Sequence, residues 1–304
     1  MGKRVFMFPG QGSQYIGMGK DFYETFPAAK EVFELAGEAA KLDVAKLCFE
    51  EEDKINQTEY TQIAMLTTEA AILKVLQNEG VSADAAAGLS LGEYAAILAA
   101  EVMEPKDVFA LIRKRGVYMQ NAVPTGGAMA AVLGLDAATI EKVCEDTFGE
   151  VFVANYNCPG QIVITGEQSA VDRASESLKE AGAKRVVPLK VSGPFHSKLL
   201  TGAGKQLGEA LLNVEIHPIT IPYLTNVTAD YVKDPAEVQD YLVRQVSSSV
   251  RWQQSVERLI ADGADEFVEI GPGHTLCGFM KKINREITTY SIDKMEDFEK
   301  YVNR

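Results

Sequence analysis

A serine between two glycines offers the clearest chemistry in this sequence. Ser90 lies in the segment Gly88-Leu89-Ser90-Leu91-Gly92, which matches the G-x-S-x-G pattern of a nucleophilic serine on a sharp strand-to-helix turn. Small flanking residues permit a strained backbone that projects the hydroxyl outward, and a helix beginning just after Ser90 would point N–H groups at a developing oxyanion. The pattern also arises by chance, so the alternative interpretation is a tight turn that packs a strand on a helix.

A serine nucleophile needs a general base, and the chain contains only three histidines. His196 and His274 both follow predicted strands, where active-site loops gather, and we favour His196 of the two. His217 precedes a proline in an apolar stretch and is interpreted as structural. The scarcity of histidine argues against a zinc site, and the four widely separated cysteines are expected to be reduced thiols.

A cation on the apolar face of a predicted helix is a further candidate. In the helix expected over 107–120, Arg115 falls within the stripe of apolar side chains, whereas Arg113 and Lys114 point away from it. A buried guanidinium requires an anion or several acceptors. Two interpretations stay open here: a salt bridge to an internal Asp or Glu, or a bidentate contact with a substrate carboxylate.

Alternating strands and helices must position these residues. A strand over 4–8 runs into the turn 9–14, which lacks the third glycine of a dinucleotide site and the ending of a P-loop. We expect its backbone N–H groups to face a ligand at the strand end. The other elements predicted outside the middle of the chain are a helix over 60–79, a strand over 83–89, a helix over 92–100, a strand over 219–225, helices near 236–246 and 250–262, and a strand over 265–270.

The middle of the chain predicts a separate unit. Its predicted elements are strand 128–135, helix 136–148, strand 151–156, strand 161–166, helix 169–182 and strand 185–191. This β-α-β-β-α-β order is that of a ferredoxin-like domain, and the flanks 124–127 and 192–194 read as hinges. We therefore predict an α/β protein: a hydrolase-like, mostly parallel sheet core (1–125 and 193–304) with an inserted ferredoxin-like small domain (126–192).

Composition and charge limit the partners. A net charge of −13 disfavours non-specific binding to nucleic acid or anionic lipid, and no apolar stretch has transmembrane or signal-peptide length. We expect a cytoplasmic monomer without nucleic-acid or membrane partners. Two basic clusters could meet an acidic partner, although a solvated face is the simpler interpretation. They are Lys184, Arg185, Lys190 and Lys198, and Lys281, Lys282 and Arg285.

Several separated segments, taken together, are more specific than any single motif. They are residues 8–14 (FPGQGSQ), 88–94 (GLSLGEY), 115–116 (RG) with 119–120 (MQ), 155–157 (NYN) with 159–161 (PGQ), His196, 242–245 (LVRQ) and 271–273 (GPG). In this order the chain resembles the malonyl-CoA:acyl carrier protein transacylases of bacterial fatty acid synthesis. The resemblance extends from residue 5 to about residue 280.

The resemblance implies a role for each matched residue. Ser90 would be the nucleophile and His196 its base, and a carbonyl of Gln245 would orient the imidazole where a hydrolase triad uses an acid. Backbone N–H groups of Gln11 and Leu91 would form the oxyanion hole. The family also implies the hydrolase-like core with a ferredoxin-like insert.

The resemblance further implies the substrates. A malonyl group would pass from malonyl-CoA to the serine and then to the phosphopantetheine thiol of acyl carrier protein, without a metal or cofactor. Arg115 would hold the free malonyl carboxylate. The remaining substrate-binding residues implied are Gln11, Met119, Asn157 and Phe195.

Two positions depart from the family pattern. The residue before the nucleophile is usually histidine but here is Leu89, so that histidine has no counterpart and the site is less polar. Phe195 matches malonyl-selecting relatives, whereas Gly193 and Pro194 do not, so acyl transfer is better supported than strict malonyl selectivity. The alternatives left open are a serine hydrolase such as a thioesterase, an acyltransferase of a polyketide pathway, and a non-catalytic carrier-binding scaffold.

Overall fold

A parallel sheet forms the centre of the larger part of the molecule, in a computed structural model that describes residues 2–191 and 193–304. Its strand order is β7-β2-β1-β8-β9, and every pairing is parallel. The strands are β1 (Lys3–Phe8), β2 (Ala85–Gly88), β7 (Tyr223–Leu224), β8 (Ala264–Ile270) and β9 (Thr288–Ile292). The carboxyl ends of these strands therefore meet at one edge, where sites of parallel sheets are built.

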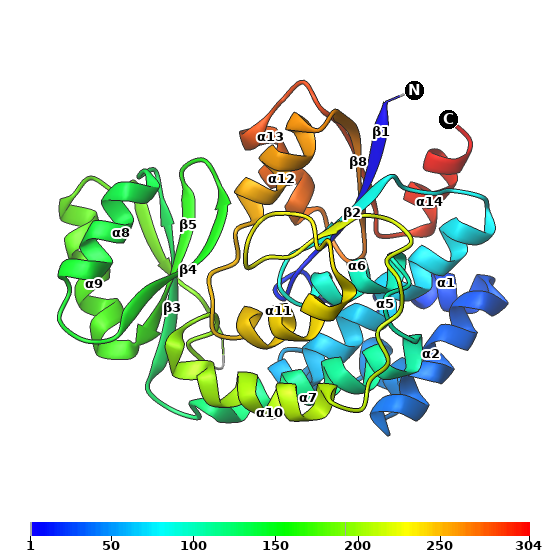
Figure 1. The fold of residues 1–304 in the computed structure, drawn as a ribbon, viewed down its shortest axis with the longest axis horizontal. Helices are drawn as coiled ribbons and strands as arrows, with labels where there is room; N and C mark the ends of the chain where they lie inside the picture. Colours follow the sequence, from blue (N-terminus) through cyan, green and yellow to red (C-terminus); the bar gives the residue numbers. More distant parts are fainter. Residues whose placement is uncertain (1, 192) are drawn as a thin grey trace.

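Helices cover both faces of this sheet (Figure 1). Side chains alternate along a strand, so Phe6 and Phe8 of β1 enter a core with the long buried helix α5, while Val5 and Met7 enter a second core with α12 and α13. The helices are α1 (Lys20–Thr25), α2 (Pro27–Ala40), α3 (Val44–Phe49), α4 (Glu52–Ile55), α5 (Thr58–Asn78), α6 (Gly92–Ala99), α7 (Pro105–Ala122), α10 (Thr201–Leu211), α11 (Val238–Gln245), α12 (Trp252–Ala261), α13 (Thr275–Ile283) and α14 (Met295–Val302), with 3₁₀ turns η1 (Lys198–Leu200) and η2 (Pro235–Glu237).

A second, antiparallel sheet projects to one side of the molecule, drawn in green in Figure 1. Its order is β4-β5-β3-β6, and with its two helices it encloses a core of its own. The elements are β3 (Gly127–Leu133), α8 (Ala137–Asp146), β4 (Val151–Cys158), β5 (Gln161–Glu167), α9 (Gln168–Glu180) and β6 (Arg185–Pro188). The predicted α/β class, a mostly parallel sheet with a separate small sheet, is confirmed.

The exact domain limits stay a prediction. A division into 1–125 with 193–304 and 126–192 agrees with the separate core of the second sheet. Met1 and Ser192 lie outside the described residues, and so does the part of the predicted hinge that falls on Ser192.

Several predicted strands are shorter in the structure, among them the strand expected over 83–89, which is β2 (Ala85–Gly88). The strand expected over 219–225 is reduced to β7, because Pro222 lacks an N–H and Thr220 donates its N–H and its hydroxyl to the carbonyl of Ala100, both at 3.0 Å. The strand expected over 185–191 ends at Pro188. Several elements form where none was predicted: α1 to α4, α10, α13, β9 and α14.

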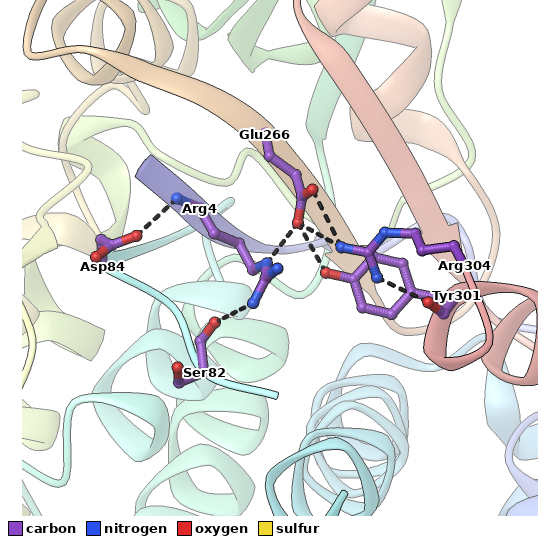
Figure 2. A network of polar contacts seen from close by, with 6 residues as sticks. All are labelled: Arg4, Ser82, Asp84, Glu266, Tyr301 and Arg304. Carbon is purple, nitrogen blue, oxygen red and sulfur yellow. Dashed lines mark hydrogen bonds and ion pairs between the residues drawn. The ribbon is translucent and has the colours of Figure 1, made fainter. Parts of the chain in front are cut away.

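A polar cluster fastens the two ends of the chain together (Figure 2). Glu266 of β8 accepts hydrogen bonds from Arg4 of β1, from the hydroxyl of Tyr301 at 2.9 Å, and from Arg304 at 2.9 and 3.1 Å. The Arg304 guanidinium also stacks 3.6 Å from the Tyr301 ring centroid. This terminal cluster holds α14 against the sheet.

Backbone hydrogen bonds join the second sheet to the rest of the molecule. Val250 donates to the carbonyl of Ala154 on β4 at 2.8 Å, and Tyr156 donates back to Val250 at 2.9 Å. The hydroxyl of Ser249 adds a bond to the carbonyl of Val153 at 2.6 Å. The second sheet therefore lies fixed beside the loop that follows α11.

Candidate active site

The nucleophile segment forms a tight turn between β2 and α6. Ser90 has φ 55°, in the left-handed region that non-glycine residues rarely adopt. A Cβ on Gly88 would lie 1.9 Å from the backbone of Gly92, and a Cβ on Gly92 would lie 2.2 Å from the carbonyl oxygen of Phe8. A residue larger than glycine would therefore clash at either flanking position. The turn projects the Ser90 side chain into a pocket.

His196 lies beside this serine. Its Nε2 is 2.8 Å from Ser90 Oγ, and its Nδ1 is 3.0 Å from the backbone carbonyl oxygen of Gln245. Because a carbonyl can only accept, Nδ1 carries the proton and Nε2 is left free to accept one from the serine. Burial, and then the charge of Arg115, lower the pKa of His196 to about 4, so the imidazole is neutral at physiological pH.

Arg115 is 1% exposed, and its hydrogen-bond partners among the described residues are neutral groups. Its Nη1 donates to Gln62 Oε1 at 2.7 Å, and its Nη2 donates to Gln245 Oε1 and to Ser90 Oγ, both at 3.0 Å. Across residues 2–191 and 193–304, no carboxylate lies within 4.0 Å of this guanidinium, and its Nε is unpartnered. The interpretation of Arg115 as half of an internal salt bridge is therefore wrong. Burial lowers its pKa, yet guanidinium stays protonated in proteins.

Two backbone amides lie where an oxyanion could bind. Gln11 follows the carboxyl end of β1, and Leu91 is the N-cap residue of α6; both line the pocket at Ser90. Within the part of the chain that the structure describes, neither amide donates a hydrogen bond to a protein acceptor. Both donors are thus free to serve a ligand in the pocket.

The pocket at Ser90 has a volume of about 290 Å³ and lies between the two sheets. The other substrate-binding residues expected from the sequence, Met119, Asn157 and Phe195, all line it. Leu89 lines it too: its side chain packs on Gly10, where a Cβ would lie 2.6 Å from Leu89 Cδ2, so the position usually held by histidine supplies an apolar wall.

Some predicted candidates lie outside this site. His274 is exposed at the N-terminus of α13 and lines a separate pocket with Lys282. The structure thus brings His196, rather than His274, to the serine. Both basic clusters are on the surface, and Lys282 donates to Gln161 of β5 at 2.9 Å.

Sequence reasoning missed three polar residues of the site: Gln62 on α5, Glu93 on α6 and Asn226 after β7. Glu93 is fully buried and accepts from the Asn226 N–H at 2.9 Å and from Gln245 Nε2 at 2.7 Å. Burial raises the pKa of Glu93 to about 7, although these hydrogen bonds and the charge of Arg115 oppose the rise. Glu93 could have been found from the sequence, because it is a charged residue in the otherwise apolar helix 92–99, just as Arg115 is a charged residue on an apolar helix face.

The described residues contain no group of three or more His, Cys, Asp and Glu side chains placed to hold a metal ion. No helix among them is both long and apolar enough to cross a bilayer.

A serine on a strand–turn–helix, bonded to a neutral histidine, places the protein among enzymes that attack acyl groups through a serine. The family model of the acyl transferase domain matches residues 5–296, and the chain belongs to this family. The protein is therefore an acyltransferase.

Relatives with names and structures lie well within this family. The Malonyl CoA-acyl carrier protein transacylase of Bacillus subtilis is 45% identical, over 98% of this chain and 96% of that protein. The crystal structure of MCAT from Streptococcus pneumoniae is 44% identical, with a TM-score of 0.96 and 99% of each chain covered. A structure of a type II PKS acyl-carrier protein in complex with its malonyl-transacylase matches at 36% identity, with a TM-score of 0.96 and 99% of each chain covered.

Proposed function

We propose that this protein transfers a malonyl group from malonyl-CoA to the phosphopantetheine thiol of acyl carrier protein, through a malonyl ester on Ser90, and thereby supplies fatty acid elongation. One observation carries the proposal: the Ser90–His196 pair, at 2.8 Å, lies beside a buried arginine whose partners are all neutral. The names of the relatives support it, since they are malonyl transacylases and one is bound to a carrier protein.

The first half-reaction acylates the serine. Nε2 of His196 takes the Ser90 proton as Oγ attacks the thioester carbon, and the carbonyl electrons move onto oxygen. The amides of Gln11 and Leu91 stabilise that oxyanion. When the tetrahedral intermediate collapses, the carbon–sulfur bond breaks and His196 returns its proton to the leaving coenzyme A thiolate.

The second half-reaction is the same chemistry with a different thiol. His196 takes the proton of the carrier's phosphopantetheine thiol, whose sulfur attacks the malonyl ester, and Ser90 leaves with the proton restored. The carbonyl of Gln245 holds the imidazole in the required tautomer throughout. The ester must outlast the exchange of coenzyme A for carrier protein, so the apolar walls of Leu89 and Phe195 serve to keep water away.

Arg115 selects the acyl group. A malonyl carboxylate gives the guanidinium a charged partner, and the planar donor pair binds a carboxylate in bidentate fashion. This contact fixes the thioester carbonyl relative to Ser90 Oγ, which lies 3.0 Å from Arg115 Nη2. Met119 and Asn157 complete the walls around the acyl chain and the pantetheine arm.

The charge of the surface supports a docking site for the partner. Acyl carrier protein would dock on the exposed basic residues Lys184, Arg185, Lys190 and Lys198, and we propose a cytoplasmic monomer. Reversing the charge of these residues should raise the KM for carrier protein and leave the KM for malonyl-CoA unchanged. An equal rise in both constants would count against this surface.

The function is tested by incubating the protein with radiolabelled malonyl-CoA and then digesting it. Label should appear on the peptide that contains Ser90, and it should move to holo carrier protein when that is added. A panel of acyl-CoAs measures selectivity for malonyl. Label on any other peptide, or release of free malonate to water without transfer to the carrier, would overturn the proposal, the second outcome in favour of a thioesterase.

A further inference from the structure

The turn that carries Ser90 needs an external support. A left-handed backbone at a non-glycine residue persists only where surrounding groups over-determine it. The Ser90 N–H lies in the turn between β2 and α6, and the Gly88 carbonyl lies at the end of β2, one residue beyond the last pairing with β7. These two groups must find hydrogen bonds elsewhere or remain unsatisfied in a buried region.

The side chain of Asn226 provides both bonds. Its Oδ1 accepts from the Ser90 N–H at 2.6 Å, and its Nδ2 donates to the Gly88 carbonyl at 2.6 Å. Asn226 is 2% exposed, and it is held in turn by a bond from its own N–H to Glu93 Oε2 at 2.9 Å. A single amide group thus spans the turn from one side of the nucleophile to the other.

Strand register explains how a residue 136 positions away reaches the turn. β7 pairs with β2 in parallel, with Leu224 opposite Ala87. Both strands end at the same edge of the sheet, so Asn226 arrives beside Ser90. The pairing of the two-residue strand β7 with β2 therefore places the Asn226 side chain.

Glu93 connects this support to the base. Its Oε2 accepts both the Asn226 N–H and Gln245 Nε2, the latter at 2.7 Å. Gln245 Nε2 also donates to the Ser90 carbonyl at 2.9 Å, while the Gln245 carbonyl holds His196. The nucleophile and the base are thus positioned by one continuous set of buried hydrogen bonds.

We propose that Asn226 is a positioning residue for the nucleophile: its side-chain amide holds the Ser90 turn so that Oγ stays within reach of His196, and Glu93 holds Asn226 and Gln245 in a common arrangement. This inference rests on the proposed acylation of Ser90. It also implies that the Ser90 amide is occupied and that the oxyanion is served by other amides.

The test measures acylation per active site. Malonyl-enzyme formation is followed by rapid quench without carrier protein, so that the burst amplitude counts folded sites and the burst rate reports their reactivity. Asn226→Ala should lower the rate by about 10- to 100-fold, as expected for a misplaced nucleophile, while the concentration of malonyl-CoA for half-maximal rate stays unchanged. Ser255→Ala is the matched control, because it removes a buried hydroxyl that bonds a backbone carbonyl at 3.0 Å outside the site.

Asn226→Asp separates positioning from general stability. A carboxylate can accept from Ser90 but repels the Gly88 carbonyl and Glu93, whereas the protonated acid restores the donor. The rate per site of this variant should therefore rise toward that of the unaltered protein as the pH falls from 8 to 5. The rate of the unaltered protein at each pH shows how far the titration of Glu93 and His196 changes the rate when Asn226 is present.

The outcomes are distinct. No burst in the unaltered protein would refute the proposed function itself. A normal burst in the unaltered protein, with Asn226→Ala reduced in amplitude but unchanged in rate per site, would refute the positioning role. A rate ratio for Asn226→Asp that does not change with pH would also refute it.

Discussion

Two arginine clusters in this molecule differ in whether an acid of the chain pairs with the arginine charge. In the terminal cluster, Arg4 and Arg304 share the carboxylate of Glu266 at a partly buried position. In the buried cluster around Ser90, Arg115 has three neutral acceptors and one unpartnered nitrogen among the described residues. The first cluster satisfies its cations with an acid of the chain, and the second does not.

A cation that no acid of the chain satisfies keeps the capacity to bind an anionic ligand. Burial alone would raise the pKa of Glu266, but the hydrogen bonds from Arg4, Tyr301 and Arg304 outweigh it and hold the pKa below its ordinary value. Among the described residues no such acid forms an ion pair with Arg115, and Glu93 acts on its charge from a greater distance. A substrate carboxylate would complete that pairing, which a permanent salt bridge would preclude.

The largest effect should come from removing the base of the buried cluster. His196→Ala should slow formation of the malonyl enzyme by at least about 1000-fold, because Ser90 loses the proton acceptor that lies 2.8 Å from its hydroxyl. His274→Ala, an exposed histidine outside the pocket, should stay within about twofold, as is usual for a residue that contacts neither substrate nor base. Single-turnover acylation with malonyl-CoA measures both, and equal losses would break the assignment.

The next largest effect concerns Arg115. Arg115→Ala should lower kcat/KM for malonyl-CoA by about 10- to 100-fold, the usual size for a hydrogen-bonded contact to a charged group. The rate with acetyl-CoA, which has no free carboxylate, should fall much less. Steady-state assays with both thioesters decide the matter, since equal losses would mean that Arg115 only supports the local structure.

The charge of Arg115 should also affect how kcat/KM depends on pH, because it contributes to the lowered pKa of His196. Neutral His196 is the active form, so kcat/KM should hold as the pH falls below the ordinary imidazole pKa and should be lost near the lowered value of about 4. Arg115→Gln removes a cation that contributes to the lowering, so the acid limb should move upward in pH. Profiles with acetyl-CoA avoid the loss of malonyl binding, and an unmoved limb would contradict this coupling.

The smallest effect should appear in the terminal cluster. Arg304→Ala removes two bonds to Glu266 and the stacking on Tyr301, and should lower the free energy of unfolding by up to about 1 kcal/mol, as for exposed ion pairs. Acylation should be unchanged. Urea denaturation measures the change in stability, and the single-turnover assay measures acylation. A slower acylation would contradict a purely structural role for the terminal cluster.

Local patterns predicted the parts of the fold that local physics determines. Gly88 and Gly92 mark the nucleophile turn because a Cβ at either position collides with backbone, and that constraint can be read from five residues. Arg115 could be singled out because its charge interrupts an apolar helix face. The β-α-β-β-α-β order was visible because each of its elements carries its own periodicity.

Long-range contacts could not be predicted in this way. Asn226 reaches Ser90 only through the pairing of β7 with β2, and a strand of two residues carries almost no periodic signal. Gln62 lies on α5, which is buried on all sides, so no amphipathic pattern marks the face turned to Arg115. The side-chain hydrogen bonds that place these residues in the site join positions 53 and 136 residues apart in the sequence.

The backbone bridge at Val250 has a mechanical consequence. The second sheet is attached by the chain before β3, by the chain after β6, and by hydrogen bonds to the rest of the molecule, among them the two between Val250 and β4. With the two chain connections alone, the second sheet, which forms one wall of the pocket, could rotate about them. The hydrogen bonds between Val250 and β4 lie on that wall, so such a rotation would have to break them. These hydrogen bonds therefore oppose a change in the width of the pocket.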